Sequence, residues 1–255
     1  MRFILSWIFT IPFFVFFFLI LFVFHPIQVI ALKLDGYSAH KKVVDWMCFC
    51  LVQNLHWTLS RVSLKNLAGD LPTDRPLIIV SNHQSAMDIP MIAWVFRKNH
   101  PKYISKESNG KGIPSISYNI RNGGSVLIDR EKPKEALQKI QKFAEKLGEK
   151  NYAACIFPEG TRTKDGNLHE FKSRGIAQLL DSMPNALIVP VAIQDNWKIE
   201  SKKFMPIPVF NHFRCTALQP IEPSKHEKEE LAGLIRSQIE EFLDNSVSQN
   251  TLSSK

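Results

Sequence analysis

The chain has 255 residues and carries 32 Lys and Arg against 24 Asp and Glu, which gives a formal net charge of +8. This length is enough for one full-sized domain with a substantial core, and the charge suits an anionic partner such as a phospholipid headgroup or a phosphorylated substrate. No basic run interleaved with aromatic residues is present, so the sequence argues against a nucleic-acid partner.

The N-terminal segment, residues 3–24, is almost wholly apolar and is interrupted only by Ser6, Thr10 and Pro12. A helix needs roughly 20 apolar residues to cross a bilayer, so this segment is long enough. The alternative is a cleaved signal peptide, whose apolar stretch is about 7–15 residues and ends at a small-residue cleavage site. The segment is longer and lacks such a site, so we predict a retained membrane anchor over residues 1–30.

A second hydrophobic segment, residues 43–59, is predicted to be helical. Its uninterrupted apolar stretch, residues 46–52, is too short to span a bilayer, and its tryptophans, Trp46 and Trp57, suit the headgroup level. A helix in the membrane interface and an ordinary core helix both fit this pattern. We assign residues 31–65 to a membrane-proximal helical segment.

Strands and helices alternate from residue 76 onward. Short apolar runs rich in β-branched residues predict four strands, at residues 77–80, 125–128, 153–157 and 187–193. Apolar residues at helical spacing predict three helices, one ending near Phe96, one over 133–147 and one over 231–242. The alternation predicts a single α/β domain, residues 66–245, with a mostly parallel sheet flanked by helices and a polar tail, 246–255. Pro190 lacks a donor, so its strand is expected at an edge or bulged there.

The first candidate site is His83-x-x-x-x-Asp88, directly after the first predicted strand. His40 and Asp45 repeat this spacing, so the spacing alone is weak. His83 is favoured because it follows a buried strand, at the edge of an α/β sheet where ligands usually bind. The structural alternative is a solvated histidine beside a helix cap at Asp88. A capping Asp88 could also accept a hydrogen bond from one ring nitrogen of His83 and leave the other as a base.

The second candidate site is the turn at residues 157–162, Phe-Pro-Glu-Gly-Thr-Arg, which follows the strand at 153–157. Gly160 allows positive φ or a close approach of the backbone to a ligand. Arg162 offers a planar fork for a phosphate. Thr161 adds a hydroxyl, and Glu159 adds a carboxylate. The alternative is a structural turn with an exposed ion pair.

Four blocks of sequence, in order, resemble those of the glycerolipid acyltransferase superfamily, most closely the bacterial 1-acyl-sn-glycerol-3-phosphate acyltransferases. They are Asn82-His83-x-x-x-x-Asp88, Gly124-x-x-Leu127-Ile128-Asp129-Arg130, Phe157-Pro158-Glu159-Gly160-Thr161-Arg162 and Val189-Pro190-Val191. The blocks lie within residues 75–195. Leu127 stands where an aromatic residue is frequent in the family.

The resemblance implies a role for each block. His83 would be the general base, Asp88 its partner, and the strand at 189–191 would line the acyl site. The residues expected to bind the acceptor, with Thr161 included for its hydroxyl, are Arg130, Glu159, Gly160, Thr161 and Arg162. Lys106 and Lys172 lie where similar proteins often carry basic residues, although each also fits an ordinary solvated lysine.

The implied reaction moves a fatty acyl group from a thioester, acyl-CoA or acyl carrier protein, to the free hydroxyl of 1-acyl-sn-glycerol 3-phosphate. The product is phosphatidic acid. The pKa of that hydroxyl lies far above neutrality, so the hydroxyl needs a base such as His83. A covalent enzyme intermediate is not required, and the sequence contains no G-x-S-x-G elbow.

No cofactor and no metal are expected. The four cysteines form no C-x-x-C pair and no metal-finger spacing, so we interpret them as core thiols in a reducing compartment. Acyl donors of this type are cytoplasmic, which places the domain on the cytoplasmic face of the inner membrane. The alternatives are an acyltransferase with another acceptor (a lysophospholipid, glycerol 3-phosphate or an aminolipid) and a non-catalytic protein that binds anionic lipid at the membrane surface.

Overall fold

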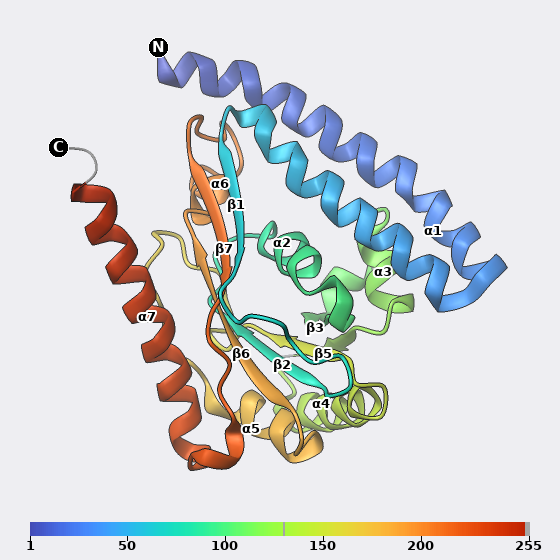
Figure 1. The fold of residues 1–255 in the computed structure, drawn as a ribbon. Helices are drawn as coiled ribbons and strands as arrows, with labels where there is room; N and C mark the ends of the chain where they lie inside the picture. The colour runs from blue at the N-terminus through green and yellow to red at the C-terminus, as the bar shows by residue number, and fades with distance from the viewer. Residues whose placement is uncertain (130, 253–255) are drawn as a thin grey trace.

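The computed structural model describes residues 1–129 and 131–252, with side chains described up to residue 246. Over these residues the chain forms one sheet of seven strands in the order β1-β7-β6-β2-β5-β3-β4 (Figure 1). The strands are β1 Arg61–Asn66, β2 Leu77–Ser81, β3 Lys102–Lys106, β4 Val126–Ile128, β5 Ala153–Ile156, β6 Leu187–Gln194 and β7 His212–Ala217. The α-helices are α1 Arg2–Asn54, α2 Asp88–Val95, α3 Ile116–Asn122, α4 Pro133–Gly148, α5 Ser173–Ser182, α6 Trp197–Glu200 and α7 Lys228–Leu252.

The pairing of the strands confirms the predicted mostly parallel sheet. Strands β6, β2, β5, β3 and β4 are parallel neighbours, and only the β6–β7 pair is antiparallel among the described strands. The carboxyl ends of the five parallel strands therefore meet at one edge of the sheet.

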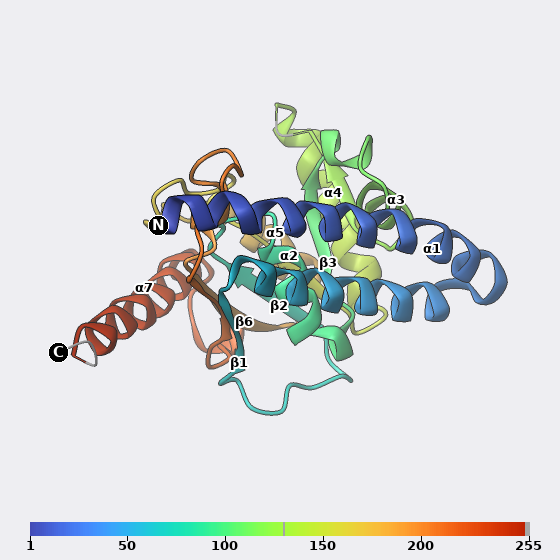
Figure 2. The ribbon, with the colours of Figure 1, turned by 90° about the horizontal axis from the view of Figure 1, so that it is seen from above.

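Helices cover both faces of the sheet (Figures 1 and 2). Ile78 and Val80 of β2 pack with α4, α5 and α7 on one face, and the alternating residues Leu77 and Ile79 pack with α1 and α2 on the other. This alternation follows from the two-residue period of a strand. Because both faces are buried, β2 reads as a continuous apolar run, as central parallel strands do.

Helix α1 is a helical hairpin rather than one straight rod. Asp35 and Gly36 leave the helical conformation, Gly36 with φ of 63°, and the two arms lie side by side (Figures 1 and 2). The break falls a few residues after the predicted boundary between the anchor and the membrane-proximal segment. The second arm packs on the sheet through Met47, Leu51 and Val52. One side of this segment thus packs as a core helix does, while Trp46 and Trp57 stay exposed, and its place relative to a membrane interface stays a prediction.

The first arm of α1 is long and apolar enough to cross a membrane by length and composition, although one such helix near the N-terminus is weak evidence by itself. Only 17% of its most apolar window is buried. Two hydrogen bonds join it to the domain: Thr10 Oγ1 accepts the Ile207 N–H (2.9 Å), and the Leu21 carbonyl accepts a hydrogen bond from Ser115 Oγ (2.6 Å). The arm is thus attached to the domain along one side and exposes apolar side chains on the other.

Strand β6 corrects one expectation about Pro190. It lies between β2 and β7 and is not an edge strand. The pairing with the following chain shifts by one residue across Pro190, since Ile188 bridges to Ile221 but Val191 pairs with Ala217. Between these two pairs the facing chain has one residue more than β6, so the bulge lies in the segment 218–220 and the predicted bulge of β6 at Pro190 is wrong.

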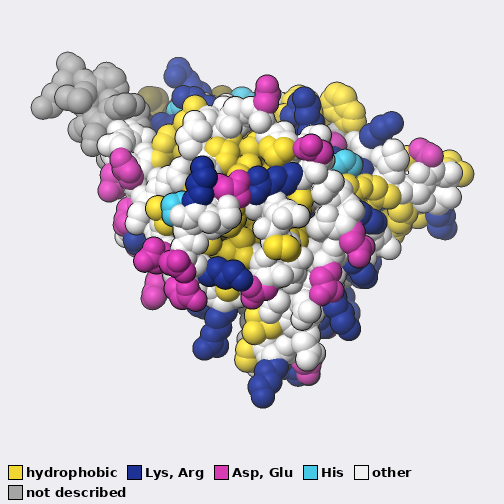
Figure 3. Space-filling view, turned by 60° about the horizontal axis from the view of Figure 1, so that its bottom comes forward, with side chains coloured by type: hydrophobic (Ala, Val, Ile, Leu, Met, Phe, Trp, Pro, Cys, Tyr) yellow, Lys and Arg dark blue, Asp and Glu magenta, His cyan; other side chains and the backbone are white. Residues whose placement is uncertain are grey.

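Charged side chains of both signs are interspersed on the face shown in Figure 3, and Lys and Arg do not gather there into one continuous area. Helix α7 continues to Leu252 and so includes the first part of the predicted polar tail. Residues 253–255 lie outside the described residues.

Lys102, at the start of β3, is a buried amine beneath the turn of α1. It is 6% exposed, and its Nζ lies 4.8 Å from the ring centre of Tyr37. Burial, and secondarily the charge of Lys41, lowers the pKa of Lys102 from 10.5 to about 7. The folded protein therefore releases this proton near pH 7, whereas the unfolded chain holds it up to about its ordinary value.

Replacement of Lys102 by methionine is expected to flatten the pH dependence of stability. Because the unfolded state binds the extra proton between about pH 7 and 10.5, the wild-type free energy of unfolding should rise with pH relative to that of Lys102→Met, by up to about 1.4 kcal/mol per pH unit. Urea unfolding at a series of pH values measures this difference. The exposed Lys139→Met is the control. Parallel pH profiles for wild type and Lys102→Met would contradict the expectation.

Candidate functional site

The predicted site residues lie at the carboxyl edge of four neighbouring strands. His83 follows β2, the 157–162 turn follows β5, and Lys106 ends β3 beside Ile128 of β4. Sequence reasoning placed two of these motifs at strand ends, and the sheet order makes them neighbours. Arg130 lies outside the described residues.

His83 and Asp88 form a hydrogen-bonded pair. The ring Nδ1 and Asp88 Oδ2 are 2.9 Å apart, and because a carboxylate only accepts, Nδ1 carries the proton. The imidazole stacks on Phe157 with ring centres 4.0 Å apart, and 16% of the side chain is exposed. Within the described residues Nε2 has no hydrogen-bond partner. The pair therefore has the arrangement of a base whose tautomer is set by a carboxylate.

Asp88 is fully buried and accepts several hydrogen bonds. Its Oδ2 also accepts the backbone N–H groups of Gln84 (2.7 Å) and Ser85 (2.9 Å), and Oδ1 accepts Asn196 Nδ2–H (2.7 Å). Asp88 is the first residue of α2 and not its N-cap, which is Met87. The predicted helix-capping role of Asp88 is therefore wrong, and its carboxylate instead closes the preceding turn at Gln84 and Ser85 while it holds His83.

The two motifs are joined through the backbone of His83. Its N–H donates to Glu159 Oε1 (2.8 Å), and its carbonyl accepts the Thr163 N–H (2.9 Å). Glu159 is 4% exposed, and its Oε2 accepts the His169 N–H (3.3 Å). Burial raises the pKa of Glu159, and the two backbone donors lower it by less. Both carboxylate oxygens of Glu159 therefore accept a hydrogen bond from a backbone N–H.

Replacement of Glu159 by glutamine is expected to lower the free energy of unfolding by about 1–3 kcal/mol, because one buried backbone N–H then faces an amide NH₂ instead of an oxygen. Chemical denaturation measures this effect. Glu170→Gln, at an exposed position nearby, is the matched control. Unchanged stability in Glu159→Gln would show that the carboxylate does not hold the turn.

The remaining predicted residues lie on or near the turn after β5. Gly160 has φ of 73°, and a Cβ there would stand 3.2 Å from Lys172 Nζ, so the lysine amine lies against this glycine. Thr161, Arg162 and Lys172 are exposed, as is Lys106 at the end of β3. The structure thus brings Lys172 to the turn, while Lys106 is separated from β2 by strand β5.

Two residues near the site were not predicted, Asn196 and Glu200. Asn196 follows β6, so the rule that ligands gather at the ends of parallel strands would have marked it. Glu200 ends α6, and its carboxylate accepts hydrogen bonds from Arg162 Nη1 (2.6 and 2.7 Å) and from the Ala86 N–H (2.7 Å). No local sequence signal distinguishes Glu200 from a solvated glutamate.

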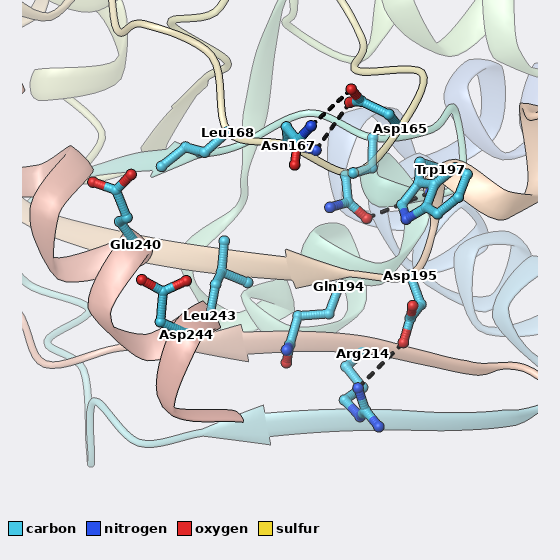
Figure 4. A pocket seen from close by; sticks show the side chains of 12 residues that line it. Asp165, Asn167, Leu168, Gln194, Asp195, Trp197, Arg214, Glu240, Leu243 and Asp244 are labelled. Carbon is cyan, nitrogen blue, oxygen red and sulfur yellow. Dashed lines mark hydrogen bonds and ion pairs between the residues drawn. The ribbon is translucent and has the colours of Figure 1, made fainter. Parts of the chain in front are cut away.

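A pocket of about 700 Å³ opens beside the site and is lined by Gln84, the neighbour of His83. Figure 4 shows its other walls, which include Asp165, Asp195, Glu240 and Asp244. The lining has four carboxylates and one cation, Arg214, which is paired with Asp195, so the pocket is unfavourable for a phosphate. Among the described residues no group of three or more His, Cys, Asp or Glu side chains could hold a metal ion.

Comparison with known proteins identifies relatives. A profile described as acyltransferase matches residues 61–194. The chain is 26% identical over 219 residues to a 1-acyl-sn-glycerol-3-phosphate acyltransferase of Saccharomyces cerevisiae, with 85% of this chain and 68% of the yeast protein covered. It is 30% identical over 155 residues to one of Cocos nucifera (60% and 48% covered) and 31% over 147 residues to one of Helicobacter pylori (58% and 60% covered). The chain therefore spans only about half to two thirds of the length of these relatives.

A solved structure has the same fold. The crystal structure of the 1-acyl-sn-glycerophosphate (LPA) acyltransferase of Thermotoga maritima aligns with a TM-score of 0.79 at 22% identity. The alignment covers 96% of this chain and 97% of that one. The similarity extends over the helical hairpin as well as the sheet.

Proposed function

The chain belongs to the acyltransferase family, whose profile covers more than half of it, and on this basis we propose that it transfers a fatty acyl group from a thioester to the free hydroxyl of 1-acyl-sn-glycerol 3-phosphate. The expected resemblance to this family is thereby confirmed. The observation that carries the proposal is the His83–Asp88 pair, 2.9 Å between Nδ1 and Oδ2, held at the end of a central strand. Pure binding of a lipid needs no such base.

In the proposed mechanism Nε2 of His83 accepts the proton of the acceptor hydroxyl as the oxygen attacks the thioester carbonyl. The C–O bond forms, the C–S bond breaks, and the proton passes from His83 to the departing thiolate. Asp88 stabilises the imidazolium that exists in between. General-base assistance of this kind contributes about 10²–10⁴-fold. The donor is acyl-CoA or acyl carrier protein.

The acceptor phosphate is proposed to lie at the turn after β5. Arg162 supplies a guanidinium and Lys172 an ammonium beside Gly160. The family resemblance adds Arg130, Thr161 and Lys106 as predicted contacts. For Glu159 we propose a positioning role toward His83 in place of the substrate contact expected from sequence, because both its oxygens accept backbone N–H groups.

The first arm of α1 is proposed to be the membrane-binding element. The arm is attached to the domain at two points, through Thr10 to Ile207 and through Leu21 to Ser115. A helix held in this way cannot place one end on the far side of a bilayer while the domain stays on the near side. We therefore propose that it lies in the interface with its exposed apolar side chains in the lipid. A cytoplasmic domain on the inner membrane fits the location of acyl thioesters.

The test is acyl transfer by purified protein in detergent micelles. Thiol release from acyl-CoA should require an acceptor, and 1-acyl-sn-glycerol 3-phosphate should give phosphatidic acid, identified by mass. A panel with glycerol 3-phosphate, lysophosphatidylethanolamine and an aminolipid tests the other acceptors. Absence of thiol release from acyl-CoA and from acyl carrier protein, together with tight binding to anionic vesicles, would instead support a non-catalytic lipid-binding protein.

A further inference from the structure

Glu200 occupies two donors at the edge of the proposed phosphate site. Arg162 Nη1 donates to both carboxylate oxygens, at 2.6 and 2.7 Å, and the Ala86 N–H donates to Oε1 at 2.7 Å. One donor is a guanidinium from the turn after β5, and the other is a backbone amide from the turn that contains His83. A guanidinium with a nearby backbone N–H is a common way to hold a phosphate oxygen.

The carboxylate is held close to the reacting pair by a short stretch of chain. Glu200 ends α6, and Asn196, at the N-cap of this helix, donates to Asp88 Oδ1 at 2.7 Å. The Glu200 side chain is 19% exposed and that of Arg162 is 43% exposed. The pair is therefore open to solvent on the arginine side, from which a phosphate could approach.

We propose that Glu200 is an internal ligand of the site that binds the acceptor's phosphate. Between turnovers its carboxylate accepts hydrogen bonds from Arg162 and the Ala86 N–H. The phosphate of the substrate then displaces this carboxylate. This inference rests on the proposed function, because it takes Arg162 as a phosphate contact. The need to displace the carboxylate weakens the binding of the acceptor and of the product by the same factor, since both carry the same phosphate. Glu200 thus raises the KM for the acceptor and helps the product phosphate to leave.

The alternative is that Glu200 helps the site to bind phosphate, and it predicts a change in phosphate affinity of the opposite sign when the carboxylate is removed. If the carboxylate only positions Arg162 for substrate, its removal weakens phosphate binding. If it competes with the phosphate, its removal strengthens binding. Glutamine keeps an oxygen that can accept the Ala86 N–H but removes the charge, so Glu200→Gln separates the charge from the hydrogen bond.

The kinetic test compares wild type, Glu200→Gln and Glu222→Gln, which breaks a similar ion pair with Arg75 (2.6 Å) that involves none of the proposed site residues. We expect Glu200→Gln to lower the KM for 1-acyl-sn-glycerol 3-phosphate and the inhibition constant of phosphatidic acid by a common factor of about 3–10. The KM for acyl-CoA should stay unchanged, and so should all constants of Glu222→Gln. A higher KM for the acceptor in Glu200→Gln would overturn the proposal.

A direct binding measurement keeps this inference separate from the proposed function. Binding of glycerol 3-phosphate, followed by NMR titration of the full chain in detergent, does not depend on acyl transfer. We expect Glu200→Gln to bind it about 3–10-fold more tightly than wild type. In an Arg162→Ala background the same substitution should change binding less than about twofold. An equal gain in both backgrounds would reveal a general charge effect and overturn the proposal.

Discussion

Replacement of His83 by alanine is expected to lower kcat by about 10²–10⁴-fold, with little change in the KM for the acceptor. The imidazole is the group placed to take the hydroxyl proton, since it directly follows β2 and its tautomer is set by Asp88. The acceptor phosphate is held by other residues in the proposed mechanism, so ground-state binding should persist. Initial rates of thiol release at varied acceptor concentration separate the two constants.

The control for this substitution is His226→Ala, at an exposed position before α7. Its rates should match those of wild type. Thermal unfolding of both variants checks that the fold is kept, since His83 also stacks on Phe157. Retention of activity in His83→Ala with unchanged lipid binding would show that another group is the base.

Replacement of Asp88 by asparagine is expected to lower kcat by about 10–100-fold while the protein stays folded. An amide oxygen at the Oδ2 position can still accept the donors from His83, Gln84 and Ser85. The new NH₂ would face Asn196, whose Oδ1 is buried without a partner and can accept it after the Asn196 amide rotates. Only the charge that stabilises the imidazolium is then lost, and a hydrogen bond to a charged group contributes about 1.5–3 kcal/mol.

Steady-state kinetics and thermal unfolding of Asp88→Asn test both parts of this expectation. The exposed Asp70→Asn serves as the control. A double variant tests whether Asn196 accepts the new amide group. The variant with both Asp88→Asn and Asn196→Ala should unfold at a clearly lower temperature than either single variant. A kcat for Asp88→Asn equal to that of wild type would mean that the carboxylate is not the partner of His83.

Elements with a strong local pattern were predicted well. The strands at 77–80 and 153–157 and the helix from Pro133 match β2, β5 and α4 closely. The edge strand β1 and the strands β3 and β7 were not predicted. The sequence of β1, Arg61–Asn66, is half exposed, and β3 has lysine at both ends. Such strands owe their conformation to pairing with distant neighbours, which a local pattern does not contain.

The candidate site likewise has parts that the sequence predicted and parts that only the fold reveals. His83 and the 157–162 turn could be placed from sequence because each follows a buried strand, and the ends of parallel strands share one edge. The burial of Glu159 against the His83 backbone could not be predicted from the sequence, because it depends on how two loops 76 residues apart meet in the fold. Glu200 approaches Arg162 across 38 residues of chain and carries no motif. The geometry places these residues, but the catalytic and binding roles of all the predicted site residues, His83 and Asp88 included, stay predictions.

The attachments of the first arm of α1 have a consequence for the order in which the chain is made. Thr10 bonds to Ile207, 197 residues later, and Leu21 bonds to Ser115, 94 residues later. During synthesis, which proceeds from the N-terminus, the arm leaves the ribosome long before these partners exist. The second arm of α1 follows much sooner, and its Asn54 donates to the Phe13 carbonyl only 41 residues away. The helical hairpin is therefore complete before the sheet and loops to which it is fixed have been made.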